Sequence, residues 1–105
     1  MLIKSTAKVD KKTKNLVKRL KPGDIAVIDH IDLDEVSANS LVDSKPSLII
    51  NASKSISGRY PNLGPRIVAK AGIPILDDVG TEAFRSICEN DMVEIIHNEI
   101  FINSQ

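Results

Sequence analysis

The sequence predicts a single α/β domain with a central, largely parallel sheet, flanking helices and a terminal antiparallel hairpin. Three short apolar runs, at residues 25–28, 48–50 and 73–76, have the length and composition of strands buried on both faces. Helical patterns separate these runs, and strands that alternate with helices form parallel sheets with right-handed crossovers. Two later apolar runs, at 92–96 and 100–102, predict the hairpin, with His97, Asn98 and Glu99 between them.

Capping residues and a proline indicate where the first two expected helices begin or end. The first begins near Thr13 and continues on an amphipathic pattern until Pro22 stops it. Asp32 is expected to cap the second helix, because Glu35 three residues later completes a capping-box pattern. The residues expected on the inner face of that helix are Val36, Ala38, Leu41 and Val42.

The last two helices have similar signals. The third is expected over residues 63–71, with Asn62 as its cap and Gly72 as its stop signal. The fourth begins with Thr81 as its cap. Cys88 falls on this helix next to Ile87, where a buried and inert thiol is expected.

Length and composition are those of an ordinary soluble globular domain. A chain of 105 residues with 42% hydrophobic and 27% charged residues is large enough for one core, so residues 1–105 are interpreted as one domain. No apolar run approaches the roughly 20 residues that cross a bilayer, and the first residues lack the apolar core of a signal peptide. The single cysteine fits a reducing cytoplasm, which is the expected location.

Charge is unevenly distributed along the chain. Residues 1–21, a basic segment with a short helix, hold eight of the fourteen basic side chains and one acid, Asp10, whereas the remainder is acidic. A basic segment can contact a nucleic acid or a membrane surface. Because only 3% of the residues are aromatic, few side chains can stack on bases, and a nucleic acid is not the expected partner. A solvated helix face, or a surface that meets an acidic neighbour, is favoured.

Polar residues follow each of the three buried runs. In an open parallel sheet the carboxyl ends of the strands lie along one edge, here called the rim, and ligands bind there. Residues 51–62, NASKSISGRYPN, are expected to form a loop over the rim. The residues directly after the runs are Asp29 and His30, Asn51 and Ser53, and Asp77 and Asp78.

The loop has the residue types of an anion site. Ser55 and Ser57 offer hydroxyls, as does Ser53, Gly58 permits close approach of the backbone, and Arg59 offers a planar charged fork. The helix that follows directs free N–H groups at the same place. A phosphate-bearing ligand is one interpretation. The other is an ordered connection, in which the serines bond to their own backbone and Arg59 pairs with an acid of the rim.

The same positions carry residue types that bind metals or transfer protons. Asp77 and Asp78 could hold Mg²⁺ together with Asp29 or Asp32. Adjacent residues of a strand point to opposite faces, however, which favours solvated or capping carboxylates. His30 has the residue type of a general base. No serine or cysteine nucleophile motif accompanies it, so a hydrogen-bonded residue at the strand end is favoured. The sequence predicts neither a catalytic residue nor a metal site.

The order of several strings resembles a known fold. GDIAVID, SLIINAS, AGIPILDDVG and ENDMVEI follow one another as in the swivelling β/β/α domain of phosphoenolpyruvate-utilising enzymes, over about residues 23–102. In that group a histidine before the Gly-Ile-Pro strand carries a phosphoryl group. Counting back from Gly72 places Leu63 at that position. The resemblance therefore implies the scaffold without the phosphohistidine chemistry.

A closer resemblance is carried by PGDIAVIDHIDLDEV, INASKSISGRYPNLGP and AGIPILDDVG. These strings are similar to the amino-terminal region of the bacterial cytokinetic ring proteins of the SteA type, which are related to thiamin pyrophosphokinases. The resemblance implies a longer protein, in which a thiamin-pyrophosphokinase-like domain follows and a membrane-spanning segment lies near the carboxyl end. The positions that it marks for ligand binding or docking are Ser55, Ser57, Gly58, Arg59, Tyr60, Pro61, Asn62 and Gly64 of the loop, with Asp29, His30, Asp77 and Asp78.

Two functions follow from this resemblance. The first is a non-catalytic binding or docking module of a cell-division protein, whose loop takes a neighbouring domain or a phosphate-bearing ligand such as a nucleotide. The second is part of a phosphotransferase whose active site is shared with the carboxyl-terminal domain. The expected partners are that domain, a cell-division protein or a second copy of the chain. No cofactor is firmly implied.

Overall fold

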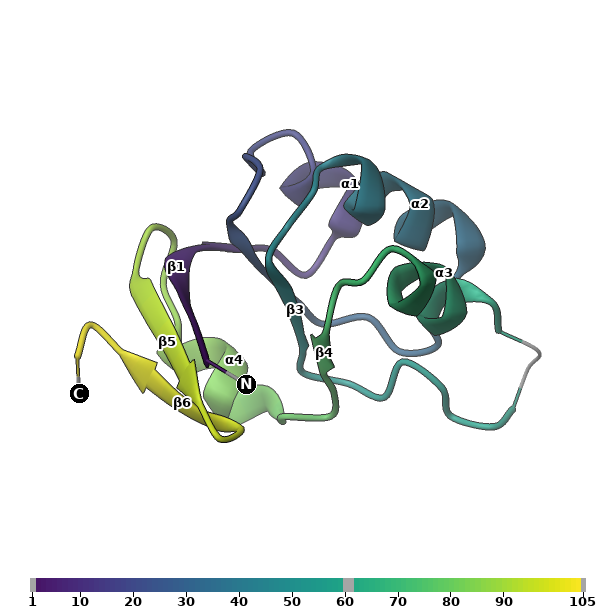
Figure 1. Cartoon of the computed structure of the whole chain (residues 1–105). Coiled ribbons are helices and arrows are strands. Elements are labelled where there is room, and N and C mark those ends of the chain that lie inside the picture. The colour runs from purple at the N-terminus through teal and green to yellow at the C-terminus, as the bar shows by residue number, and fades with distance from the viewer. Residues whose placement is uncertain (1, 60–61, 105) are drawn as a thin grey trace.

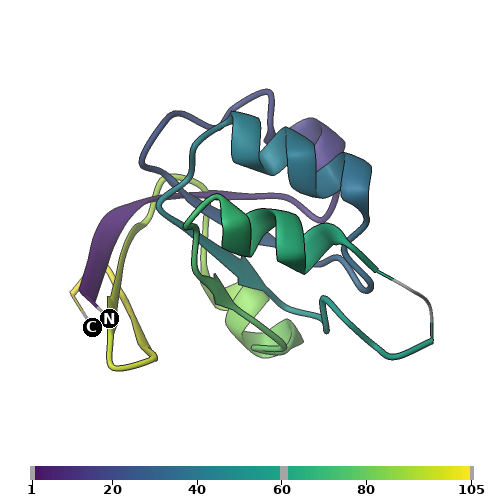
Figure 2. The ribbon, with the colours of Figure 1, turned by 45° about the vertical axis from the view of Figure 1, so that its right-hand side comes forward.

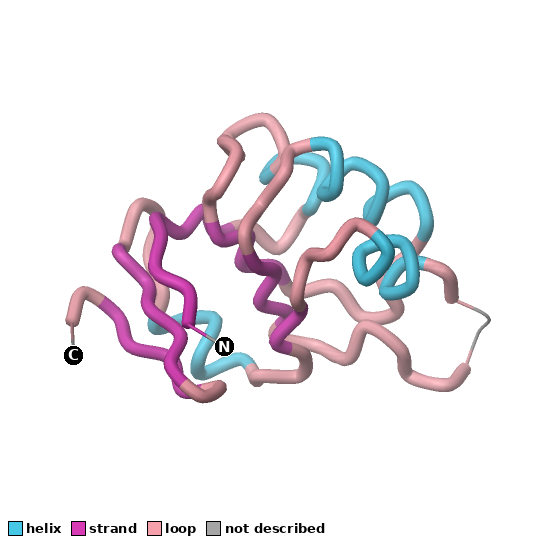
Figure 3. The backbone as a smooth tube through the Cα atoms, in the orientation of Figure 1, coloured by secondary structure: helices cyan, strands magenta, loops and turns pink. Residues whose placement is uncertain are grey.

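A six-stranded mixed sheet and four helices make up the part of the chain that the structure, a computed structural model, describes, which is residues 2–59 and 62–104. The spatial order of the strands is β4-β3-β2-β1-β5-β6, and the sheet curls so that its two ends face different directions (Figures 1 and 3). The strands are β1 (Leu2–Val9), β2 (Ile25–Ile28), β3 (Leu48–Asn51), β4 (Ile75–Leu76), β5 (Met92–Ile96) and β6 (Glu99–Ile102).

The parallel half of the sheet confirms the predicted alternation of strands and helices. β2 pairs with β3, and β3 with β4, all in parallel. β2 and β3 are buried at every residue, as expected for strands covered on both faces. The hairpin of β5 and β6 is antiparallel as predicted, and His97 and Asn98 form its turn with positive φ angles of 49° and 66°. Glu99, which was also expected between the strands, is the first residue of β6 and pairs with Ile96.

β1 is the element that the sequence did not predict. Its last residues, from Ala7 to Val9, pair in parallel with β2, whereas the residues from Leu2 to Thr6 pair antiparallel with β5. β1 therefore joins the parallel half to the hairpin. Ile3, Ala7 and Val9 face the core, and Lys4 and Lys8 alternate with them. The alternation is weak in the sequence because Ser5 interrupts the apolar face, and the lysines suggest a solvated basic segment.

Helices cover both faces of the sheet. α1 (Thr13–Leu16), α2 (Glu35–Asp43) and α3 (Gly64–Lys70) lie on one face, and α4 (Thr81–Ser86) lies on the other (Figures 1 and 2). Alternate residues of the same strands supply the two cores. Ala26, Ile28 and Ile49 pack with the first three helices, while Val27 and Ile50 pack with the hairpin and the residues around α4.

Two helix ends differ from their predicted positions. α1 ends at Leu16 rather than near Pro22, because the N–H groups of Lys18 and Arg19 bond three residues back, that of Arg19 to the Leu16 carbonyl at 2.9 Å. The cap of α2 is Asp34, not Asp32, and its carboxylate accepts the Ser37 N–H at 3.2 Å.

The remaining elements correct three details. Val36 was expected on the inner face of α2 but is 74% exposed. β4 has two residues, Ile75 and Leu76, whereas a strand over 73–76 was expected. Thr81 is the first residue of α4 rather than its cap, which is Gly80 with a φ of 95°.

Candidate functional site

Residues 51–59 of the expected loop extend from the end of β3, at the edge where β2, β3 and β4 end, and Asn62 and Leu63 directly precede α3 (Figures 1 and 2). Its first residues pair with the connection after β4, since the N–H groups of Asp78, Val79 and Gly80 donate to carbonyls of residues 51–53. On its other side, Asp32 and Leu33 donate their N–H groups to carbonyls of residues 54 and 55. The loop is therefore tied to both neighbouring connections of the rim.

Three serines of the loop each donate a hydroxyl hydrogen bond to a different aspartate of the rim. The N–H groups of Ser55 and Ser57 donate to the same carboxylates as their own hydroxyls, so these two residues are each held twice. We call this set of pairs the serine clamp. Its members are Ser53 with Asp29 at 2.5 Å, Ser55 with Asp77 at 2.6 Å, and Ser57 with Asp32 at 2.8 Å.

Asn51 connects the clamp to the sheet. Its side chain is fully buried at the end of β3, and Oδ1 accepts the N–H groups of His30 at 3.0 Å and Ser53 at 3.1 Å. Nδ2 donates to the His30 carbonyl at 2.8 Å and to the Ser55 hydroxyl at 2.9 Å. Sequence reasoning placed Asn51 on the rim but not among the site positions. The available signal was an amide residue at the end of a fully apolar run, where strands rarely place asparagine.

His30 is bonded to the start of α2. Its Nε2 lies 3.2 Å from an Asp34 carboxylate oxygen and 3.4 Å from the Ser37 hydroxyl, and Nδ1 lies 3.0 Å from the Ile31 carbonyl. Each ring nitrogen thus has a partner within its own connection. This geometry matches a hydrogen-bonded residue at a strand end rather than a base directed at a substrate.

Buried and exposed residues alternate along the loop from Ser53 to Gly58, as they do along a strand. Ser55 is 3% exposed and the other two clamp serines are half-buried, whereas the residues between and after them are exposed. Alternate side chains of an extended segment point in opposite directions. The exposed members of this alternation are Lys54, Ile56 and Gly58.

The tip of the loop carries the predicted cation. Arg59 is exposed, and its N–H donates to the Ser57 hydroxyl at 3.2 Å. Gly58 has a φ of 90°, which favours glycine. Two other positions of the predicted site, Tyr60 and Pro61, lie outside the described residues.

Hydrogen bonds from the N–H and the hydroxyl of Ser57 hold the pKa of Asp32 below its ordinary value of 3.8. The positive charge of Arg59 lowers this pKa further. The ion pairs among residues 2–59 and 62–104 are those of Arg19 and His30, so the expected direct pairing of Arg59 with an acid of the rim is not formed there.

Asn62 and Gly64 fix the start of α3. The Asn62 side chain accepts the Gly64 N–H at 3.1 Å and donates to the Ser55 carbonyl at 2.5 Å. A Cβ atom on Gly64 would lie 1.9 Å from the Leu33 carbonyl oxygen, so only glycine fits where α3 meets the connection before α2. Both predicted site residues thus have structural roles. The N-cap itself is Leu63, which is exposed and makes no side-chain cap.

Negative charge remains on the rim after these bonds are made. The donors to Asp29, Asp32 and Asp77 within the clamp are neutral hydroxyls and amides, which leave each carboxylate its charge. Among residues 2–59 and 62–104, no group of three or more His, Cys, Asp or Glu side chains is arranged to hold a metal ion. The clamp uses its serine hydroxyls as donors to acids, which leaves them poorly placed to bind an anion.

Exposed apolar side chains lie on the segments that the clamp holds together. Ile31, Ile56 and Leu63 are 56%, 55% and 51% exposed, and they belong to the connection before α2, the loop and the start of α3. Ile56 also lines a hollow of about 180 Å³, together with Ser55, Pro65, Ile75 and Asp77. Exposed apolar side chains mark an interaction site where they form a contiguous patch.

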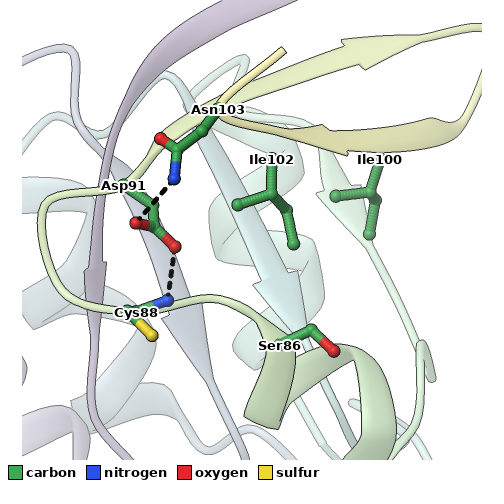
Figure 4. A pocket seen from close by; sticks show the side chains of 6 residues that line it. All are labelled: Ser86, Cys88, Asp91, Ile100, Ile102 and Asn103. Atoms are coloured by element: carbon green, nitrogen blue, oxygen red, sulfur yellow. Dashed lines mark hydrogen bonds between the residues drawn. The ribbon is translucent and has the colours of Figure 1, made fainter. Parts of the chain in front are cut away.

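A larger hollow, of about 430 Å³, lies away from the rim between the end of α4 and β6 (Figure 4). Asp91 accepts the Cys88 N–H at 2.8 Å and the Asn103 amide at 3.0 Å there. Cys88 is exposed, so the expectation of a buried thiol is wrong. The reason is that α4 ends at Ser86 and Ile87 is extended, which places Cys88 in a connection instead of on a helix face.

No protein-family model matches the chain, and a search of curated proteins found no match. In residues 2–59 and 62–104 the structure has no helix of sufficient length and apolar character to cross a membrane.

Proposed function

We propose that this chain is a non-catalytic docking module whose rim binds another folded domain. The observation that carries this proposal is the orientation of the loop side chains. The polar side chains of the serine clamp bond inward to the rim, whereas Ile56 of the same loop and Leu63 at its end are exposed to solvent. An ordered loop that presents apolar groups is suited to a preformed protein surface.

The proposed partner follows from the sequence resemblance. The strings PGDIAVIDHIDLDEV, INASKSISGRYPNLGP and AGIPILDDVG support assignment to the SteA-type cytokinetic ring proteins, in which a thiamin-pyrophosphokinase-like domain follows. We propose a swivelling-type β/β/α fold on the same basis. The mixed sheet, with helices on both faces and a terminal hairpin, is compatible with that assignment. The module would then act on the cytoplasmic side in cell division.

The test is binding of the chain to the thiamin-pyrophosphokinase-like domain of a SteA-type protein, measured by calorimetry. Ile56→Ser combined with Leu63→Ser should weaken binding at least tenfold, because both remove apolar area at the interface. The matched control is Leu2→Ser with Met92→Ser, which removes two exposed apolar side chains of β1 and β5. Equal losses in the two double variants, or no binding by the unmodified chain, would refute the proposal.

A phosphotransferase site shared with the following domain is the second candidate, and exposed Arg59 at the loop tip is the observation that favours it. In this case pyrophosphate or thiamin diphosphate should raise the melting temperature of the two domains together, and Arg59→Lys should abolish the rise, since an ammonium lacks the planar fork. An unchanged melting temperature would leave docking as the function of the rim.

A further inference from the structure

The hollow beside the loop combines an apolar wall with one carboxylate. Ile56, Pro65 and Ile75 supply the wall, and Asp77 and Ser55 supply its polar part. At about 180 Å³ it is smaller than the sites of roughly 300–1,000 Å³ that hold drug-sized ligands. The hollow has room for one long side chain.

Asp77 is held in place but keeps acceptor capacity. Both of its carboxylate oxygens receive the Ser55 N–H at 3.1 Å, and Oδ1 also receives the Ser55 hydroxyl at 2.6 Å. Two carboxylate oxygens offer about four acceptor sites, so further donors can bind. The residue is exposed, and its donors from Ser55 are neutral, so its negative charge faces the hollow uncancelled by them.

We propose that this hollow receives an arginine side chain of the protein that docks on the rim. The inference rests on the proposed docking function. It identifies the hollow as the anchor site, where one side chain of the partner is held. The aliphatic stem would pack on Ile56, Pro65 and Ile75, and the guanidinium would donate to Asp77, whose geometry Ser55 fixes in advance. The charge at the hollow itself supports a basic side chain, because Asp77 is the charged residue among the five that line it.

The test is an NMR titration of the isotopically labelled chain with the peptide acetyl-Leu-Arg-Leu-amide. The control peptide has citrulline, a neutral isostere, in place of arginine. The arginine peptide should shift the amide signals of Ser55, Ile56, Ile75 and Asp77, and the citrulline peptide should bind at least fivefold more weakly. This comparison uses the unmodified chain, so it does not depend on the folding of a variant.

Asp77→Asn should abolish the preference for arginine, whereas Asp78→Asn, which changes an adjacent exposed carboxylate, should retain it. Equal binding of the two peptides to the unmodified chain would overturn the proposal. So would salt-sensitive self-association mapped to the hollow and to the lysines of residues 1–21, which would identify the occupant as a second copy.

The two proposals fail separately. Binding of the arginine peptide with no effect of Ile56→Ser and Leu63→Ser on domain docking would leave the anchor site and refute the docking function. Domain docking that is lost in that double variant but unchanged by Asp77→Asn would leave the function and refute the anchor.

Discussion

Two clusters of hydrogen-bonded carboxylates tie distant parts of this chain together, and they treat charge differently. In the serine clamp, neutral hydroxyls and amides bond to three aspartates. At the other cluster, Arg19 donates to Glu89 at 2.7 Å and to Asp10 at 3.2 Å, and so joins the segment after α1 to the ends of β1 and α4. The hydrogen-bond donors of the first cluster are neutral, whereas the second offsets its acids with a cation.

The difference teaches which surface is available to a partner. Arg19 has both of its acidic partners within the chain, and hydrogen bonding to Glu89 raises its pKa above the ordinary value. Burial opposes ionisation of Glu89, but hydrogen bonds from Arg19 and from the Val9 N–H outweigh it and lower the pKa of Glu89. The Arg19 cluster is thus a closed structural link, and the rim is the more open of the two.

Gly64→Ala should have the largest effect, because it separates the elements that the clamp joins. The new Cβ would meet the Leu33 carbonyl, so α3 must move, at a cost of roughly 3–4 kcal/mol in free energy of unfolding. Glycine to alanine in a helix is otherwise stabilising. Urea unfolding measures the change, with Arg66→Ala on the exposed face of α3 as control. A stability equal to that of the control would contradict the close approach.

Asn51→Ala should follow, because it removes the buried connection between the clamp and the sheet. Four hydrogen bonds are lost and backbone groups of His30 lose their partners, so we expect a loss of about 2–3 kcal/mol. Asn39→Ala, the same substitution at an exposed position of α2, should change stability little. Comparable losses in both variants would show that the hydrogen bonds of Asn51 do not contribute to the free energy of unfolding.

Ser55→Ala tests the clamp itself, with an expected loss of about 1.5 kcal/mol in the free energy of unfolding. The hydroxyl is buried between Asp77 and Asn51, so its removal leaves the Asn51 amide short of an acceptor. Hydrogen exchange of the loop amides should also speed up relative to the rest of the sheet. Unchanged exchange in residues 51–59 would mean that the loop is ordered by other contacts.

Arg19→Gln should cost less than Ser55→Ala, at about 0.5 kcal/mol, although it removes two ion pairs. The Arg19 side chain is 39% exposed, and solvent screens such pairs. The difference between the unmodified chain and the variant should shrink when the salt concentration rises from low to molar. A loss of stability that is larger than that of Ser55→Ala and independent of salt would show that the Arg19 cluster contributes more to stability than the serine clamp.

The smallest expected effect is the change in stability of Asp32→Asn with pH. The pKa of Asp32 is lowered in the folded chain, so its stabilising contribution is complete above its ordinary value of 3.8 and is lost as the pH falls through the lower folded value. Asp32→Asn keeps a residue type that tolerates the φ of 53°. The variant should be less stable at neutral pH and should converge with the unmodified chain as the pH falls through the lowered pKa of Asp32 in the folded chain. A constant difference across this range would contradict the assignment.

The sequence was informative where burial alone decides structure. β2 and β3 lie within fully apolar runs, and their place in a parallel sheet follows from the helices between them. β1 was missed because its pairing depends on partners at the opposite end of the chain, which a local pattern of lysines and small polar residues does not reveal.

The rim was partly predictable for a related reason. The predicted ends of the strands identify the residues that meet at the rim, but they do not identify the hydrogen-bond partners of these residues. Asp32 fits a local capping pattern, yet Ser57, 25 residues away, takes its carboxylate, and its φ of 53° lies outside the range of a cap. Likewise the serines are compatible with an anion site by type, and only the fold shows that they donate to aspartates.

Because inward and outward residues alternate along the loop, the number of residues in the loop is more constrained than the identity of its exposed residues. Insertion or deletion of one residue between Asn51 and Ser57 would exchange the inward and outward sets, turning serines to solvent and Ile56 toward the carboxylates. Substitutions at Lys54 or Ile56 leave the clamp intact. Among homologous chains, this loop should therefore vary in its exposed residues while keeping its residue count, contrary to the general tolerance of surface loops for insertions.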